Sequence, residues 1–159
     1  MKIIYSTGPH LGSWFLRTVL FSEWSHCGII MEDGSTVIEA SSKHGVVETP
    51  IEKFTRYGEW AIQDVPVPDD EAAYAAAREQ LGKGYDWFGL LGLALSREWQ
   101  NDEDWFCSEL IQHCKVRAGL IDLRYDQRRV TPRDLWNLPY PVLAWQSDKG
   151  RQYGLNHTA

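Results

Sequence analysis

A β-hairpin signal near the start of this 159-residue chain limits its possible folds more than any other stretch. Two apolar runs, at 24–31 and 36–40, flank a polar segment that contains the dipeptide Asp33-Gly34. Aspartate followed by glycine between apolar runs is a strong short-range indication of a tight turn that joins antiparallel strands. The sequence therefore predicts an antiparallel hairpin over 24–40.

The register of this hairpin decides which side chains share a face of the sheet. If the strands close symmetrically on Asp33-Gly34, His26 lies opposite Ser41 and Gly28 lies opposite Glu39. Because side chains alternate along a strand, one face carries His26, Gly28, Ile30, Val37, Glu39 and Ser41. Glu39 is then the diagonal neighbour of His26, and Gly28 leaves space for the Glu39 carboxylate to accept a hydrogen bond from the imidazole.

A cysteine begins the second informative stretch, where an acidic run changes into an amphipathic helix. From Cys107 onward, the apolar residues have the spacing of one helical face, at Leu110, Ile111, Cys114 and Ala118. Cys107 is therefore predicted in the first turn of a helix, where unpaired backbone N–H groups and a partial positive charge favour a thiolate. This position makes Cys107 a candidate nucleophile.

A structural interpretation of these residues competes with the catalytic one. Free cysteines are often buried as small hydrophobic residues, and the carboxylates at 102–104 would raise the pKa of a nearby thiol. A cation beside Cys107 would offset those charges, and the candidates are His26 and His44, the latter in the loop after Glu39. His26 or Glu39 alone is most simply a structural strand-end residue. Their shared face favours an arrangement of nucleophile, base and orienting carboxylate.

Charge and cysteine content exclude several classes of protein. The chain has a net charge of −6 and no basic tract that could neutralise phosphates, so we expect no nucleic-acid binding. Three cysteines without a C-x-x-C pair fit a reduced chain, and the absence of a close ligand pair leads us to expect no metal and no cofactor. A structural metal site that combines His26, Cys107 and another thiol is a less favoured alternative.

The apolar stretches of the chain bear on its location. Residues 1–8 lack the apolar run of a signal peptide, and the longest apolar stretch, 89–95, is too short to span a bilayer. We therefore expect a protein without a transmembrane segment, cytoplasmic in the absence of an export signal. The oligomeric state stays open.

The remaining segments predict a small α+β domain with a mostly antiparallel sheet. Further strands are expected at 2–7, 45–49, 59–65 and 141–145. Helices are expected at 13–21, 69–81, 85–95 and 130–136, in addition to the helix that begins at Cys107. We expect a single domain over 1–146 and a polar tail over 147–159.

Several motifs, taken in order, resemble those of a known family. They are Trp24-Ser25-His26-Cys27-Gly28-Ile29, Val37-Ile38-Glu39-Ala40, Gly45-Val46, Tyr85-Asp86 and Phe106-Cys107-Ser108-Glu109-Leu110-Ile111. In order and spacing they resemble the circularly permuted branch of the NlpC-type papain-like cysteine peptidases, the YiiX- and YebB-like proteins, and more distantly lecithin retinol acyltransferase. The resemblance extends to about Leu143. It implies a permuted papain-like fold, in which a small antiparallel sheet or partial barrel packs against helices.

The resemblance also implies roles for individual residues. Cys107 matches the nucleophile, His26 the base and Glu39 the orienting residue, while Tyr85 matches a tyrosine near the oxyanion. Two residues that adjoin the motifs, Ser108 and Trp24, are further candidates for contact with the oxyanion or the substrate.

The function implied by the resemblance is that of a cysteine hydrolase or acyltransferase. It would act through a Cys-His-Glu triad on an amide bond, peptide bonds included, or on an ester bond. Its substrate would be a small molecule, a peptide or a lipid-derived acyl compound. The alternative is a non-catalytic ligand-binding module with the same fold.

Overall fold

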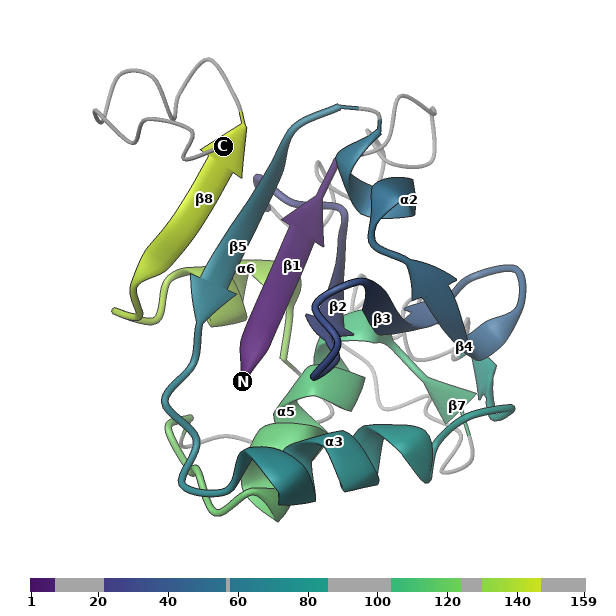
Figure 1. Cartoon of the computed structure of the whole chain (residues 1–159), viewed down its shortest axis with the longest axis vertical. Helices are drawn as coiled ribbons and strands as arrows, with labels where there is room; N and C mark the ends of the chain where they lie inside the picture. The colour runs from purple at the N-terminus through teal and green to yellow at the C-terminus, as the bar shows by residue number, and fades with distance from the viewer. Residues whose placement is uncertain (8–21, 57, 86–103, 124–129, 147–159) are drawn as a thin grey trace, which may run out of the picture.

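The computed structural model describes residues 1–7, 22–56, 58–85, 104–123 and 130–146. These residues form an α+β fold around a six-stranded antiparallel sheet of order β4-β3-β2-β1-β5-β8 (Figure 1). The strands are β1 (Lys2–Ser6), β2 (His26–Ile30), β3 (Thr36–Ser41), β4 (Gly45–Pro50), β5 (Trp60–Asp64) and β8 (Val142–Gln146). The predicted fold class is confirmed.

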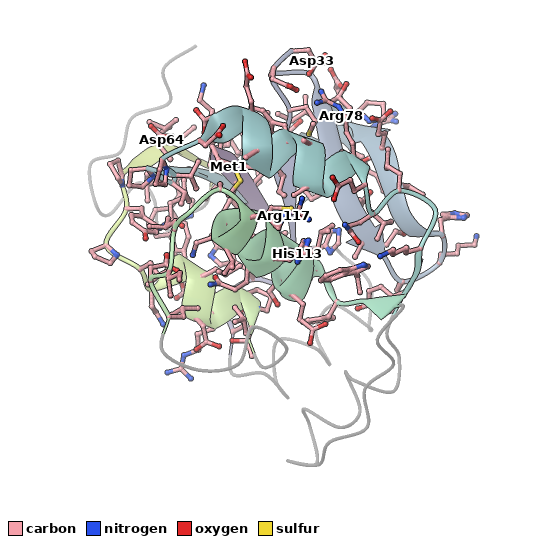
Figure 2. All side chains as sticks on the ribbon, turned by 90° about the horizontal axis from the view of Figure 1, so that it is seen from below. Met1, Asp33, Asp64, Arg78, His113 and Arg117 are labelled. Carbon is pink, nitrogen blue, oxygen red and sulfur yellow. The ribbon has the colours of Figure 1, made fainter. Side chains whose placement is uncertain are left out.

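The helices of the described part are α2 (Glu52–Thr55), α3 (Asp70–Arg78), α5 (Cys107–Arg117) and α6 (Pro132–Trp136). Figure 2 shows α3 and α5 next to each other, seen from the side that carries Arg78, His113 and Arg117. Both helices pack on one face of the sheet, where the main core includes Ile3, Cys27, Ile29 and Cys107. The other face carries a smaller apolar cluster of Ile4, Ile30, Val37 and Phe54, in which Phe54 comes from α2.

The hairpin closes in the predicted register. Ile29 pairs with Ile38 and Ile30 with Val37, and the turn is held by Asp33 Oδ1, which accepts hydrogen bonds from the backbone N–H groups of Ser35 and Thr36. The pairing between β2 and β3 extends no further than Ile29 and Ile38, although β2 begins at His26 and β3 continues to Ser41. The strands therefore separate toward the end that carries His26.

Gly28 is needed where the sheet meets α2. A Cβ atom at this position would lie 2.5 Å from Val37 Cγ1 and 3.2 Å from Phe54 Cζ. The absence of a side chain thus allows α2 to place the Phe54 ring close to β2, beside the His26 ring.

The helix boundaries differ in detail from those expected. The helix predicted over 69–81 is α3, which Asp69 caps by accepting a hydrogen bond of 2.9 Å from the Ala72 N–H, and it ends at Arg78. The expectation that Tyr85 begins a helix is wrong: Tyr85 ends β6 (Gly84–Tyr85), which pairs in parallel with β7 (Asp104–Trp105). Backbone pairing with a strand from further along the chain outweighs the helical periodicity at this position.

Other expectations fall on residues that the structure does not describe. They are the helix at 13–21, the remainder of the helix at 85–95, and the tail at 147–159. Within the described ranges, none of the helices combines the length and the apolar character that a bilayer crossing requires.

Candidate active site

Cys107 is the first residue of α5, as predicted from the spacing of the apolar residues. The preceding residue, Phe106, is extended, with φ −89° and ψ 150°, and its N–H donates a hydrogen bond of 3.1 Å to Glu109 Oε2. The Cys107 side chain is 1% exposed and faces β2, against which α5 packs. The start of the helix therefore presents a sulfur atom to the sheet, shielded from bulk water.

The contact between His26 and Glu39 that the hairpin register predicted is present. His26 Nε2 hydrogen-bonds Glu39 Oε2, while the imidazole ring stacks on the Phe54 ring with a centroid distance of 5.3 Å and an interplanar angle of 15°. The His26 side chain is 27% exposed, whereas that of Glu39 is 2% exposed. A buried carboxylate and an aromatic ring thus fix the orientation of a partly accessible imidazole.

Two further residues, which the sequence analysis did not identify, bind the Glu39 carboxylate. Glu39 Oε1 accepts hydrogen bonds from Thr49 Oγ1 at 2.9 Å and from Lys53 Nζ at 2.5 Å. Burial alone would raise the pKa of Glu39, but the hydrogen bonds and positive charges of His26 and Lys53 outweigh it and lower this pKa to about 2. Glu39 is therefore an anion at any pH near neutrality.

The register of β3 and β4 could have indicated one of these residues. Glu39 pairs with Val47, so Thr49 lies diagonally across from Glu39 on the same face. No sequence pattern indicated Lys53, because the contact of its Nζ with Glu39 depends on how α2 packs over the sheet.

Cys107 and His26 are a pair of candidate residues that affect each other's ionisation. Helix α5, which begins at Cys107, packs against β2, which begins at His26, and each of the two side chains shifts the pKa of the other. Because Nε2 is engaged by Glu39, Nδ1 is the ring nitrogen left for the sulfur. The described part of the chain thus brings the imidazole and the carboxylate into contact, and the Cys107 thiol affects the pKa of that imidazole.

The environment of this pair favours its charged form. Burial lowers the pKa of His26, but the hydrogen bonds and negative charges of Cys107 and Glu39 raise it above its ordinary value of 6.5. Burial raises the pKa of Cys107, but the hydrogen bonds from the Cys27 thiol, from His26 and from the Cys27 backbone, with the charge of His26, lower it below 9. Both shifts therefore favour a thiolate on Cys107 and an imidazolium on His26.

Two other candidate residues, Ser108 and Trp24, use their side chains in packing. Ser108 is fully buried and its hydroxyl donates a hydrogen bond of 2.6 Å to the Val130 carbonyl oxygen. Trp24 is 1% exposed and packs on Trp136 with a centroid distance of 5.1 Å. These contacts favour structural roles for Ser108 and Trp24 over contact with a substrate.

Tyr85 packs beside the residue that precedes α5. Its ring packs edge to face against Phe106, with centroids 6.0 Å apart, and Phe106 directly precedes Cys107. His44, the alternative base, is exposed in the loop after β3. Among the residues that the structure describes, no group of three or more His, Cys, Asp or Glu side chains is arranged to hold a metal ion.

Comparison with known proteins agrees with this architecture. The family model of the permuted papain-like amidase enzymes, YaeF/YiiX or C92, matches residues 2–135, a range that includes Cys107, His26 and Glu39. The crystal structure of yiiX from Escherichia coli O157:H7, which is described as a metalloprotein, has a similar fold, with a TM-score of 0.68 and 19% sequence identity. That similarity covers 91% of this chain and 96% of the yiiX chain. A search of curated proteins finds no match.

Proposed function

We propose that Cys107, His26 and Glu39 are the catalytic triad of this chain, which belongs to the permuted papain-like amidase family, YaeF/YiiX or C92, and is thus a thiol hydrolase of amide bonds. The observation that supports the triad is the hydrogen bond between the His26 ring and the buried Glu39 carboxylate on the strands against which α5 and its first residue, Cys107, pack. A triad of this kind supplies a nucleophile, a base and an orienting group.

The reaction begins with the thiolate of Cys107, which attacks the carbonyl carbon of the substrate. The negative charge then develops on the carbonyl oxygen, where the Cys107 backbone N–H, at the start of α5, donates a hydrogen bond to it. Tyr85 is the second donor that the family resemblance suggests. The imidazolium of His26 gives its proton to the leaving amine or alcohol, and the acyl group stays on Cys107 as a thioester.

The thioester is released in a second step. His26, now neutral, takes a proton from a water molecule, whose oxygen attacks the thioester carbonyl and frees the carboxylic acid and the Cys107 thiolate. An amine or alcohol in place of water would give acyl transfer. Esters as well as amides are therefore proposed substrates, and peptides and lipid-derived acyl compounds remain the substrate classes to test.

Trapping of the thioester tests this proposal. The protein is mixed with a panel of nitrophenyl esters and nitroanilides that carry peptide, short acyl or long acyl groups, quenched in acid and mapped by mass spectrometry. We expect an acyl adduct on Cys107. The ratio of carboxylic acid to hydroxamate formed from this adduct in the presence of hydroxylamine distinguishes hydrolysis from acyl transfer. A Cys114→Ala variant is the matched control, because Cys114 is a buried thiol on the same helix, and it should retain the adduct.

A negative result of the trapping experiment would support the non-catalytic module. In that case no acyl adduct forms with any substrate, and iodoacetamide labels Cys107 no faster than Cys27 or Cys114. An activated thiolate reacts much faster than a buried neutral thiol near neutral pH.

Substitution of Glu39 tests the orienting role. The ion pair needs Cys107 deprotonated and His26 protonated, so kcat/KM should rise with pH through about 5 and fall through about 10. Glu39→Gln removes the anion that stabilises the imidazolium, so the pKa of His26 falls and the alkaline limb moves to lower pH. We expect kcat/KM at neutral pH to fall by roughly tenfold to a hundredfold, the value of one charge-assisted hydrogen bond.

The matched control for this substitution is Glu48→Gln. Glu48 is an exposed carboxylate on the neighbouring strand β4, and its loss should leave the pH profile unchanged. An alkaline limb at the same pH in wild type and Glu39→Gln would exclude Glu39 from the triad.

A further inference from the structure

We propose that Lys53 is a positioning residue that acts on His26 through Glu39. Its ammonium group holds one oxygen of the buried carboxylate and serves as a fixed counter-charge to it while His26 loses and regains its proton. This inference rests on the proposed function, in which His26 alternates between imidazolium and neutral imidazole. Glu39 is thus bound by two cations, of which one is permanent and the other comes and goes with the reaction.

The two oxygens of the Glu39 carboxylate have different partners. Oε2 hydrogen-bonds His26 Nε2, whereas Oε1 accepts hydrogen bonds from Lys53 Nζ at 2.5 Å and from Thr49 Oγ1 at 2.9 Å. The bonds to Oε1 fix the plane of the carboxylate and leave Oε2 directed at the imidazole. Because the Glu39 side chain is 2% exposed, its charge depends on these partners rather than on bulk water.

The position of Lys53 is set by the packing of α2 on the sheet. Phe54, the next residue, is buried in the smaller apolar cluster, and its ring stacks on the His26 ring. The Ile51 N–H, just before α2, donates a hydrogen bond of 2.8 Å to the Ser35 carbonyl oxygen. One short helix, anchored at both points, thus brings an aromatic ring to the base and an ammonium group to the carboxylate.

The proposed reaction changes the charge next to Glu39. While His26 is an imidazolium, His26 and Lys53 both balance the carboxylate, and after His26 has given its proton to the leaving group, Lys53 still does. A buried carboxylate without a counter-charge tends to take up a proton, and it would then no longer orient the ring as an anion. The Lys53 side chain is 49% exposed, so its ammonium group stays hydrated and charged through both steps.

The same charge limits how tightly His26 holds its proton. In the described residues, the ionisable groups that act on His26 are Cys107 of α5 and Glu39 of β3, and both raise its pKa. Lys53 of α2 and His26 act together on Glu39 and lower the pKa of that carboxyl. Because Lys53 balances part of the Glu39 charge, the imidazolium is a stronger acid than it would be beside the carboxylate alone, and it protonates a leaving group more readily.

A titration of His26 by NMR tests this inference. The ring resonance of His26, assigned by its loss in His26→Gln, is followed as a function of pH in Cys107→Ala protein, so that no thiolate contributes. Lys53→Met removes the ammonium group and should raise the pKa of His26 by about one unit, the effect of one charge that acts across a carboxylate. Lys53→Arg keeps a permanent charge and should hold this pKa within about half a unit of the parent protein.

Two matched variants separate the charge of Lys53 from other effects. Thr49→Val removes the other donor to Glu39 Oε1 without a change of charge, and it should shift the pKa of His26 by less than half as much as Lys53→Met. Lys2→Met removes an exposed lysine of β1 whose strand partner, Ile30, is at the end of β2 remote from His26. It should leave the titration unchanged, because solvent screens charges that lie far apart on the surface.

Rates of acylation connect this titration to the reaction. In protein that retains Cys107, Lys53→Met leaves a less acidic imidazolium, which protonates a poor leaving group less readily. Acyl transfer from nitroanilides should therefore slow by about threefold or more relative to nitrophenyl esters, whose leaving group needs no proton. Equal slowing of both substrates would indicate a general loss of structure and would contradict the proposed role.

An unchanged pKa of His26 in Lys53→Met, or an equal shift in Lys53→Arg, would also overturn the role of Lys53 as a counter-charge. The NMR titration needs no substrate, so its result is independent of turnover. A raised pKa without an acyl adduct on Cys107 would refute the hydrolase mechanism alone, and an adduct with an unchanged pKa would refute only the role of Lys53.

Discussion

Cys107→Ala is expected to lower kcat/KM by at least about a thousandfold on any substrate that the wild-type protein turns over. The thiolate is the only nucleophile in the proposed mechanism, and without it the remaining donors can bind a substrate but cannot form the thioester. Initial rates of amide and ester hydrolysis measure this loss. Circular dichroism and thermal unfolding should show that the fold is retained, because alanine fits the first turn of a helix.

The matched control for this loss is Cys114→Ala, which removes a fully buried thiol from the same helix without touching His26. It should keep kcat/KM close to that of wild type. Wild-type rates in Cys107→Ala would end the enzymatic interpretation of the site.

Asp122→Ala is expected to cause the largest loss of stability, about 3–5 kcal/mol in the free energy of unfolding. Lys115 is a fully buried lysine of α5 whose Nζ lies 2.5 Å from Asp122 Oδ2, and the Tyr140 hydroxyl donates to the same oxygen. Loss of the carboxylate leaves a buried ammonium group without a counter-charge and the Tyr140 hydroxyl without its acceptor. Chemical denaturation at neutral pH measures the change.

The pH dependence of this variant has a definite sign. Burial lowers the pKa of Lys115 below 10.5, and Asp122 opposes that shift, so removal of Asp122 lowers the folded-state pKa further. The unfolded chain then binds the proton more tightly than the folded chain. The stability of Asp122→Ala should therefore recover as pH is raised from the folded-state pKa of Lys115 toward 10.5.

Two comparisons isolate the buried charge. Glu79→Ala breaks the ion pair between Glu79 and Arg117, in which the two side chains are 53% and 49% exposed. The free energy of unfolding should fall by less than about 1 kcal/mol. The double variant Lys115→Met with Asp122→Asn removes both charges and keeps an acceptor for Tyr140, so it should recover most of the loss. Equal losses in Asp122→Ala and Glu79→Ala would contradict the importance of the buried pair.

Much of the site could be predicted from local patterns in the sequence. The dipeptide Asp33-Gly34 set the register of the hairpin, and the register placed Glu39 diagonally across from His26. The spacing of apolar residues placed Cys107 at the start of its helix. These features depend on turn geometry and on side-chain periodicity, which a short stretch of sequence encodes by itself.

Other features depended on segments that meet only in the folded chain. Thr49 and Lys53 reach Glu39 because β4 and α2 return to the hairpin, and Lys115 looked like an ordinary polar residue of an amphipathic helix. Its burial follows from the packing of the segment around Asp122 over α5. Periodicity shows which face of an element is apolar, but it does not show what covers a polar side chain.

The sequence by itself determined the α+β class and the hairpin register, and it indicated the sulfur, imidazole and carboxylate groups of the proposed site. Only the tertiary structure decided that the pairing of β2 with β3 ends at Ile29 and Ile38, and that Thr49 and Lys53 reach the Glu39 carboxylate. The physical reason is that a buried carboxylate binds the donors that long-range packing brings to it, and no local pattern specifies those donors.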